Sequence, residues 1–205
     1  MKKLVLFLLL SLSQVAYSQW ERSNGIYGNT ISALAIKDNI VFVGTDSGVV
    51  FSSTNYGNSW ILKNRGLTAK YIECLSINDN IIYSGTEKGL FLSTDNGDNW
   101  ILKDSGMKNK GVHCITFDGN NIFVGSGASV FLSTDNGNNW TEKNKGLIYC
   151  YEINCIATNG NIIIVGTYGD AIFVSTNNGD SWSPKYSGLT SDNITCLAIK
   201  GTTIF

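Results

Sequence analysis

The chain has 205 residues, with 15 Lys and Arg against 16 Asp and Glu, a formal net charge of −1, and no run of like charge. This balance provides no electrostatic attraction for nucleic acid or for an anionic membrane surface, so neither is an expected partner. The content of 43% hydrophobic residues, 22 glycines and one proline is typical of an ordered, turn-rich β protein and excludes a disordered or collagen-like chain.

The N-terminus carries the pattern of a secretory signal peptide. Lys2 and Lys3 precede an apolar run over residues 4–12, and the small residues of 16–18 form a cleavage site ahead of Gln19. The run is well below the roughly 20 residues that span a bilayer, so a membrane anchor is the less favoured interpretation. We expect residues 1–18 to be removed, leaving 13 of the 15 basic residues, and the chain from Gln19 to be exported to the periplasm, cell surface or extracellular space.

Within the exported part, one octapeptide occurs four times, and its tryptophans fall 40, 40 and 42 residues apart. The copies are residues 53–60 (STNYGNSW), 93–100 (STDNGDNW), 133–140 (STDNGNNW) and 175–182 (STNNGDSW). A period near 40 residues with short strand patterns inside each copy is typical of propeller blades.

Each unit of about 41 residues contains four strand patterns. The first alternates small and large apolar residues, which predicts an inner strand packed on both faces, at residues 31–36, 72–77, 112–117, 153–158 and 194–199. An Asn-, Asp- and Gly-rich turn leads to a second, hairpin-paired strand at 40–44, 81–85, 122–125 and 162–166. A third strand precedes the octapeptide, and the Trp begins the fourth. We therefore predict an all-β fold, a β-propeller of four-stranded antiparallel blades, over residues 19–205.

The ends of this pattern predict an incomplete ring. Trp20 lies 40 residues before Trp60 and starts a fourth-strand pattern with nothing ahead of it, as expected where an N-terminal strand completes the last blade. Residues 200–205 match residues 37–42, so the chain stops within the second strand of its fifth unit. Because propellers typically have roughly 4 to 8 complete blades, we expect a fragment of four full repeats and a truncated fifth, with the C-terminal part missing.

Four of the five cysteines occupy the third position of the first strand, namely Cys74, Cys114, Cys155 and Cys196. The first copy has Ala33 there, and a position that accepts Ala or Cys is a small buried apolar site. Equivalent residues of neighbouring blades are expected to lie beyond the roughly 7 Å between Cα atoms that a disulfide allows. We expect free structural thiols, whereas Cys150 lies outside the register and is the cysteine expected to pair or react.

The octapeptide resembles the Asp-box, or BNR repeat, Ser/Thr-x-Asp-x-Gly-x-x-Trp, of the β-propellers of the sialidase superfamily. Its spacing also resembles that of photosystem II assembly factor-like repeat proteins, many of them secreted bacterial proteins. Two copies are intact and two have Asn in place of Asp. The matching residues are Asn55, Gly57, Trp60, Asp95, Gly97, Trp100, Asp135, Gly137, Trp140, Asn177, Gly179 and Trp182.

These octapeptides are interpreted as structural turns. The Asp accepts backbone N–H groups, the Gly supplies a positive φ and the Trp packs the turn onto the sheet. A competing interpretation makes Asp95, Asp98, Asp135 and Asp180 calcium ligands or catalytic acids. The spacing lacks the alternating oxygen ligands of a calcium loop, and carboxylates spread around a ring cannot converge on one bond. The resemblance implies that the boxes lie on the face away from an active site, so we assign no metal and no cofactor.

The candidate ligand site is at the start of the first strands. The residue before the small position is polar in every copy and different in every copy: Ser32, Glu73, His113, Asn154 and Thr195. These side chains would ring the upper end of the central channel, although merely solvated strand starts are the competing interpretation. Tyr71, Tyr151 and Tyr168 complete the site, and Tyr149 and Tyr186 lie nearby in sequence. Aromatic and amide-rich loops suit glycans or peptides.

The resemblance to sialidases also frames the enzyme question. Sialidases bind the substrate carboxylate with three arginines, whereas this chain has only Arg22 and Arg65, and its single proline is Pro184. Glycan cleavage by a pair of carboxylates needs two of them close together. The candidate pairs outside the octapeptides, Glu73 with Asp46 and Glu87 with His113, are not persuasive, so no catalytic residue is assigned. The favoured function is a non-catalytic exported propeller that binds protein or glycan. A glycoside hydrolase with catalytic residues partly in the missing region is the alternative.

Overall fold

The computed structural model describes residues 26, 28–148, 150–201 and 203–205, and within them every regular element is a β-strand. The predicted signal peptide and the predicted fourth strand at Trp20 lie outside the described residues. In the part of the chain described, no helix could cross a membrane.

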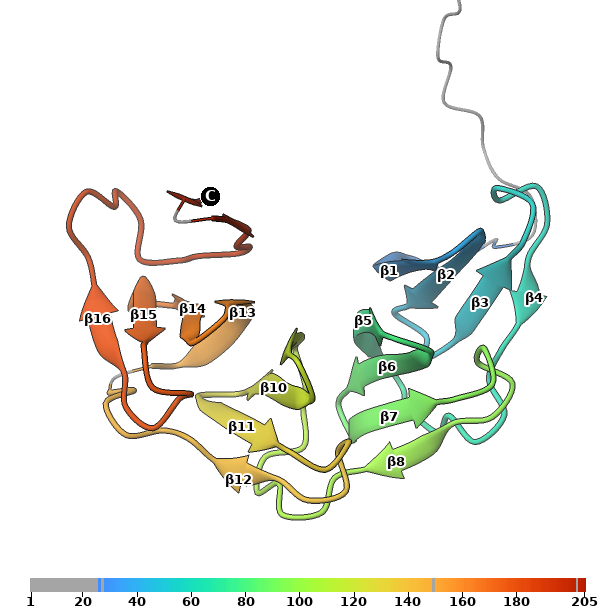
Figure 1. The fold of residues 1–205 in the computed structure, drawn as a ribbon. Helices are drawn as coiled ribbons and strands as arrows, with labels where there is room; N and C mark the ends of the chain where they lie inside the picture. The colour runs from blue at the N-terminus through green and yellow to red at the C-terminus, as the bar shows by residue number, and fades with distance from the viewer. Residues whose placement is uncertain (1–25, 27, 149, 202) are drawn as a thin grey trace, which may run out of the picture.

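Four antiparallel sheets of four strands follow one another along the chain, each with its strands in sequence order. Figure 1 shows them as the blades of an open arc, with β1, β5, β9 and β13 toward the centre and β4, β8, β12 and β16 at the periphery. Blade I comprises β1 (Ile31–Lys37), β2 (Ile40–Thr45), β3 (Val50–Ser53) and β4 (Ile61–Leu62). Blade II comprises β5 (Ile72–Asn78), β6 (Ile81–Thr86), β7 (Gly89–Ser93) and β8 (Ile101–Lys103).

The other two blades repeat this arrangement. Blade III comprises β9 (Cys114–Asp118), β10 (Asn121–Ser126), β11 (Ser129–Ser133) and β12 (Thr141–Glu142). Blade IV comprises β13 (Glu152–Asn159), β14 (Ile162–Tyr168), β15 (Ile172–Ser175) and β16 (Ser183–Lys185). The prediction of a β-propeller with four-stranded antiparallel blades is therefore confirmed.

The fifth unit corrects one predicted strand. The sequence predicted a first strand over residues 194–199, but the structure contains only a short hairpin of β17 (Ile199–Lys200) and β18 (Thr203–Ile204). Phe205 exchanges two backbone hydrogen bonds with Ala198, so pairing reaches no further back than Ala198. Alternation of apolar residues selects a strand only where a partner strand runs beside it.

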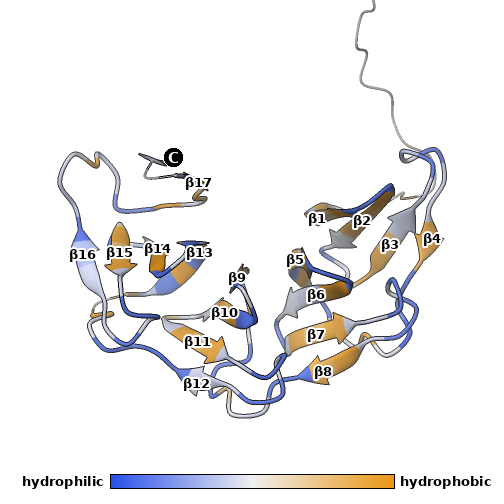
Figure 2. Cartoon of the chain, viewed as in Figure 1, coloured by the Kyte–Doolittle hydropathy of each residue, from blue (hydrophilic) through white to orange (hydrophobic). Residues whose placement is uncertain are grey.

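The core lies between the blades. Six of the eight second and third strands contribute a fully buried aromatic side chain, namely Phe42, Tyr83, Phe91, Phe123, Phe131 and Phe173. Three clusters of buried residues each join side chains of adjacent blades; Trp140 of blade III, for example, shares a cluster with Tyr83 and Leu90 of blade II. Figure 2 shows the hydrophobic residues on the strands and the hydrophilic ones mainly on the connecting turns. A blade therefore has no complete core without its neighbour.

The repeated cysteines pack at these blade junctions. The Cys74 thiol lies 3.9 Å from the Val112 carbonyl oxygen of the next blade, and Cys114 and Cys155 make the equivalent contact. A Cβ on Gly85 would lie 2.4 Å from the Cys74 sulfur and 2.5 Å from the Val112 oxygen, which explains the glycine in the second strand. All five cysteines are free thiols, but Cys196 is exposed, contrary to the expectation of burial, because it lies in the fifth unit.

Each octapeptide forms a turn closed by its own side chains. The Ser93 hydroxyl donates to Asp95 Oδ1 over 2.8 Å and accepts the Gly97 N–H over 2.8 Å. Asp95 Oδ1 also accepts the Asn99 N–H at 2.9 Å, and Asp95 Oδ2 accepts the Asn99 side-chain amide at 2.7 Å. The turn over residues 133–140 has the same bonds.

Where Asn replaces Asp, a second residue changes with it. Asn55 Oδ1 accepts the Ser59 N–H at 2.9 Å, and Asn55 Nδ2 donates to the Ser59 hydroxyl at 2.9 Å. Asn177 and Ser181 repeat these bonds. The Asp turns carry Asn four residues later and the Asn turns carry Ser, so in every copy the side chains at these two positions bond to each other.

The tryptophan of the turn contacts the preceding blade. Trp100 Nε1 donates to the Lys63 carbonyl at 2.9 Å, and Trp140 Nε1 donates to the Lys103 carbonyl at 3.1 Å. Trp182 bonds in the same way to Lys143 at 2.8 Å. The sequence predicted that the Trp packs its turn onto the sheet; in the structure, these three indoles also join one blade to the one before it.

The hydrogen bonds to the octapeptide carboxylates are expected to make the stability of the fold sensitive to acid. Hydrogen bonds from the Asn99 side chain and backbone, and then from Ser93, lower the pKa of Asp95 from 3.8 to about 2, and equivalent bonds lower the pKa of Asp135. A depressed folded-state pKa gives stability that is present above the unfolded value and is lost as the pH falls from about 3.8 toward 2. The variant Asp95→Asn/Asp135→Asn, whose amides do not titrate, will lose less stability than wild type in this window, as measured by urea unfolding at a series of pH values. The control Asp79→Asn/Asp118→Asn removes as many charges outside the octapeptide turns. Equal acid sensitivity of wild type and the turn variant would refute the assignment.

Candidate functional site

The loops opposite the octapeptide turns are held together at the start of the inner strands. The backbone N–H groups of Lys70 and Tyr71 donate to the two carboxylate oxygens of Glu87, at 2.7 and 3.1 Å. In blade I, the Thr30 N–H donates to Asp46 at 3.1 Å. In blades I and II, the loop entering the blade is thereby fixed to the turn between that blade's second and third strands. We call this edge of the blades the inner rim.

The predicted ligand-site residues that precede the small position lie on this inner rim, and we call them the polar row: Ser32, Glu73, His113, Asn154 and Thr195. Three of them lie at a repeated β-bulge. The pairing of β1 with β2 shifts between Ile31 and Ala33, that of β5 with β6 between Ile72 and Cys74, and that of β13 with β14 between Ile153 and Cys155. The residue in each shift is Ser32, Glu73 or Asn154. A bulge leaves one residue without a cross-strand partner and redirects its side chain. His113 occupies the matching position directly before β9, and Thr195 lies in the irregular segment ahead of β17.

Three side chains of the row reach the next unit along the chain. The Ser32 hydroxyl donates to the Ile72 carbonyl at 2.5 Å. Asn154 Nδ2 donates to the Ile194 carbonyl at 2.9 Å and to Asn193 Oδ1 at 3.1 Å. His113 Nε2 lies 3.2 Å from Glu152 Oε1. These members of the row therefore join neighbouring units as well as facing solvent.

Glu73 differs from these three residues. Ser32 and Asn154 donate to the carbonyl of the first apolar residue of the next unit, and in the repeat register the corresponding carbonyl for Glu73 is that of Val112. A carboxylate accepts hydrogen bonds and cannot donate to a carbonyl. Among the described residues, the Glu73 carboxylate has no hydrogen bond or ion pair, and the side chain is exposed. Thr195, which is also exposed, likewise has neither. At the junction of blades II and III, the row therefore presents an uncommitted carboxylate to solvent.

The predicted tyrosines add aromatic surface to the inner rim. Tyr71, Tyr151 and Tyr168 are 52%, 75% and 56% exposed. Tyr168 pairs across the strands with Glu152, and the ring of Tyr151 lies against Gly169, where an added Cβ would be 2.9 Å from the ring. Tyr151 is thus exposed but supported from one side. Tyr149 lies outside the described residues.

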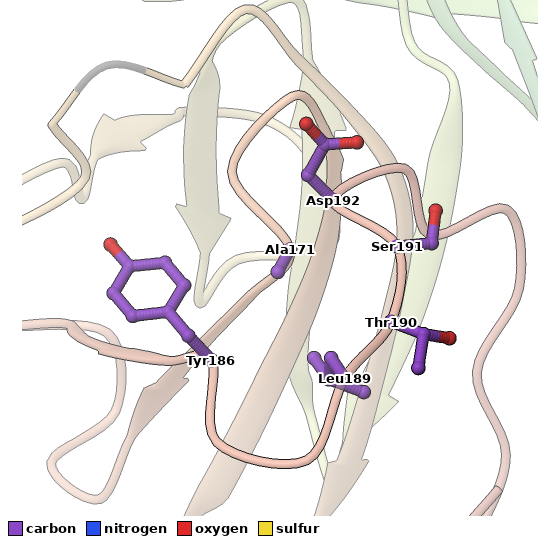
Figure 3. A pocket seen from close by; sticks show the side chains of 6 residues that line it. All are labelled: Ala171, Tyr186, Leu189, Thr190, Ser191 and Asp192. Carbon is purple, nitrogen blue, oxygen red and sulfur yellow. The ribbon is translucent and has the colours of Figure 1, made fainter.

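A cavity of about 420 Å³ lies beside blade IV, apart from the polar row (Figure 3). The residues that line it are Ala171, Tyr186, Leu189, Thr190, Ser191 and Asp192. The Asp192 carbonyl accepts the N–H groups of Gly169 and Ala171 at 3.1 and 2.9 Å. The structure brings none of the predicted row residues into this cavity.

Cys150 was the cysteine expected to form a disulfide or to react. Burial is the main cause that raises the pKa of its thiol to about 11, and the charge of Asp170 adds to the effect. A raised thiol pKa disfavours the reactive thiolate at neutral pH. Cys150 packs against the cluster that contains Phe173 and Trp182, which is a structural environment.

Sequence reasoning missed one set of inner-rim residues. Glu152 and Asn193, which partner His113 and Asn154, both precede the first apolar residue of a unit. The residues at this repeat position are Thr30, Tyr71, Gly111, Glu152 and Asn193. Alignment of the repeats displays this second variable position, but only the structure shows that Glu152 and Asn193 face the polar row of the preceding blade.

No protein-family model and no curated protein matches the chain. Solved structures match over most of its length. The extracellular domain of BT4673 from B. thetaiotaomicron is 15% identical over 88% of this chain and 26% of its own, with a TM-score of 0.73. An ancestral GH74 enzyme is 21% identical over 84% of this chain and 26% of its own, with a TM-score of 0.68. YCF48 from Cyanidioschyzon merolae is 14% identical over 83% of this chain and 60% of its own, with a TM-score of 0.63.

These likenesses define the class of the protein. The matched structures are β-propellers, and together with the four blades they place this chain in the β-propeller fold. At such identities the similarity concerns the fold alone. The chain spans less than two thirds of the length of each of these three structures.

Because Glu73 lacks the hydrogen bond that Ser32 and Asn154 make to the next unit, a donor at this position is predicted to increase the stability of the fold. Glu73→Asn places a donor where Asn154 makes its bond, so the variant will donate to the Val112 carbonyl and stabilise the fold by about 1 kcal/mol, the typical net value of one hydrogen bond. The measurement is urea unfolding of the full-length protein. Glu73→Ala is the control, because it removes the carboxylate without adding a donor. Equal stability of the two variants would show that the row does not stabilise the junction.

Proposed function

We propose that this protein is a non-catalytic exported β-propeller that binds a protein or glycan ligand on its inner rim. The observation that carries the proposal is the contrast within the repeats. The backbone bulge recurs in blades I, II and IV, where it carries Ser32, Glu73 and Asn154, and the matching position directly before β9 of blade III carries His113. A rigid scaffold that presents variable polar groups beside exposed tyrosines suits recognition.

The partners of three other inner-rim carboxylates also support binding over catalysis. Asp46 and Glu87 accept backbone N–H groups of the entering loops, and Glu152 pairs with His113. Glycoside hydrolysis by two carboxylates requires both to reach one bond, at roughly 5 to 9.5 Å from each other. Within the described part of the inner rim, the side-chain carboxylates of Glu73, in blade II, and of Asp170 and Asp192, beside blade IV, have no hydrogen-bond or ion-pair partner.

Export and domain organisation belong to the same proposal. We assign residues 1–18 to a signal peptide and residues 19–205 to a propeller of the Asp-box, or BNR, type, on the resemblance of the four octapeptides. The hydrogen bonds within these turns and the extracellular location of the BT4673 domain support this assignment. No nucleic acid and no membrane insertion is part of the proposed function.

The test combines binding and turnover on the full-length protein. It will bind members of a panel of immobilised neutral hexasaccharides (cello-, xylo-, manno- and laminarihexaose) or of an immobilised peptide library, and it will release no reducing ends from the corresponding polysaccharides. Tyr151→Ala/Tyr168→Ala will weaken binding tenfold or more, since exposed aromatic residues often dominate recognition.

The matched control is Tyr56→Asn, which removes an exposed tyrosine from an octapeptide turn where the other copies have Asn96, Asn136 and Asn178. This variant will bind as wild type does. Release of reducing ends that disappears in Glu73→Gln would replace the proposal with the hydrolase alternative. Failure of every glycan and peptide to bind would refute it.

A further inference from the structure

An asparagine followed by a glycine is a site of spontaneous backbone chemistry. The glycine nitrogen can attack the side-chain amide carbon of the asparagine, and glycine has no side chain to hinder this attack. The chain has five such pairs, of which Asn24-Gly25 lies outside the described residues. The others are three octapeptide pairs and one pair in the turn between β13 and β14: Asn96-Gly97, Asn136-Gly137, Asn178-Gly179 and Asn159-Gly160.

The octapeptide turns protect their three pairs. The Gly97 N–H donates to the Ser93 hydroxyl at 2.8 Å. The glycines of the next two octapeptides make the same bond, to Ser133 at 2.8 Å and to Ser175 at 2.9 Å. All three glycines are buried. Reaction at such a nitrogen would break a buried hydrogen bond and leave the hydroxyl without its donor, which is costly.

The pair Asn159-Gly160 has neither form of protection. Both residues are exposed, and a Cβ on Gly160 would meet no atom within 4 Å. Among the described residues, no group accepts a hydrogen bond from the Gly160 N–H. This nitrogen is therefore open to water and base, and no packed neighbour restricts the Gly160 end of the turn.

The equivalent turns of the other blades provide an internal comparison. The two residues at this position are Lys37-Asp38 in blade I, Asn78-Asp79 in blade II and Asp118-Gly119 in blade III. Asn78 therefore has no glycine after it, and Gly119 has no asparagine before it. Of the four blades, only blade IV combines an asparagine with a glycine at this position.

The Asn159 amide also makes a contact that conversion to a carboxylate would remove. Its Nδ2 donates to the Gly201 carbonyl of the fifth unit at 2.5 Å. Asn78 Nδ2 makes the equivalent bond to the Gly119 carbonyl of blade III at 3.4 Å. A carboxylate accepts hydrogen bonds and has no donor for a carbonyl. The reactive amide of Asn159 is thus also its link to the next unit.

We infer that Asn159 is a site of spontaneous deamidation, and that the reaction removes the side-chain bond between blade IV and the fifth unit. Base takes the Gly160 N–H proton, and the nitrogen attacks Asn159 Cγ. The Cγ–Nδ2 bond breaks, and Nδ2 takes a proton from water and leaves as ammonia. Water then opens the cyclic imide to aspartate or isoaspartate, so no oxidant or reductant is needed. The inference is independent of the proposed binding function.

Peptide mapping by mass spectrometry, during incubation of the full-length protein in a mildly alkaline buffer, tests the site. Asn159 will convert roughly tenfold faster than the three octapeptide asparagines, since such a rate factor corresponds to about one hydrogen bond. Asn78, which makes the same type of contact but precedes Asp79, will also convert more slowly than Asn159. Equal conversion of Asn159 and Asn78 would overturn the inference, and this comparison needs no variant.

Gly160→Asp tests the role of the glycine. Asp38 and Asp79 take the same turn position with φ of 53° and 51°, so the variant keeps the turn. It will lower the conversion of Asn159 to the rate of Asn78. Unchanged conversion in a folded Gly160→Asp protein would show that the glycine does not determine the site.

Ser93→Ala tests the protection within the octapeptides. It frees the Gly97 N–H and will raise conversion of Asn96 roughly tenfold. Ser93→Thr is the matched control, because it retains the hydroxyl, and it will leave conversion of Asn96 as in wild type. Equal conversion in the two variants would contradict protection by the hydroxyl.

Hydrogen exchange measures the structural consequence. Asn159→Asp reproduces the aspartate product, and amide exchange in residues 198–205 will be faster than in wild type by up to roughly tenfold, the effect of one lost hydrogen bond. Wild type enriched in the converted form by incubation will show the same change. Wild-type exchange in both samples would refute the loss of the link to the fifth unit.

Discussion

The contact on which the structure depends is the one between consecutive blades made by the octapeptide tryptophan. Its indole N–H bonds to a carbonyl of the preceding blade over 2.8 to 3.1 Å, and its backbone N–H bonds to a second carbonyl two residues further on, as Trp100 does with Lys63 and Arg65. A buried indole needs such a partner, and the carbonyl needs a donor. Because neither group is satisfied within one blade, the turn that closes a blade also positions it on its neighbour.

Much of the fold was predictable from the sequence because its signals are local. Alternating apolar residues, Asn- and Gly-rich turns and a repeat near 40 residues determine strands, hairpins and blades without reference to distant contacts. The partner of the tryptophan was not predictable, since it is a backbone carbonyl 37 or 39 residues away that no side chain identifies. The first strand of the fifth unit was predicted too long for a related reason: its apolar pattern was present, but pairing extends only as far as Ala198 and Phe205.

The candidate site shows the same division between local and distant information. Variable polar residues at a fixed repeat position identified the row and its position on the inner strands. The β-bulge that redirects Ser32, Glu73 and Asn154 leaves no mark in composition or periodicity, so their contacts with the next unit had to come from the structure. The second variable position is the intermediate case. It is visible in an alignment of the repeats, but the contacts of Glu152 and Asn193 with the preceding blade are seen only in the structure.

The junction of blades II and III explains how such a site is tolerated. The Val112 N–H still donates to the Thr86 carbonyl at 2.9 Å, as the Ile153 N–H does to Gly127 and the Ile194 N–H to Thr167 at the next two junctions. These backbone bonds and the cysteine contacts recur whatever side chain the bulge carries. The side-chain hydrogen bond across a junction therefore adds to an interface that the backbone bonds already stabilise. One member of the polar row can lack this bond without loss of the interface. The constancy of the backbone contacts is what allows Glu73 to face solvent without opening the ring at that point.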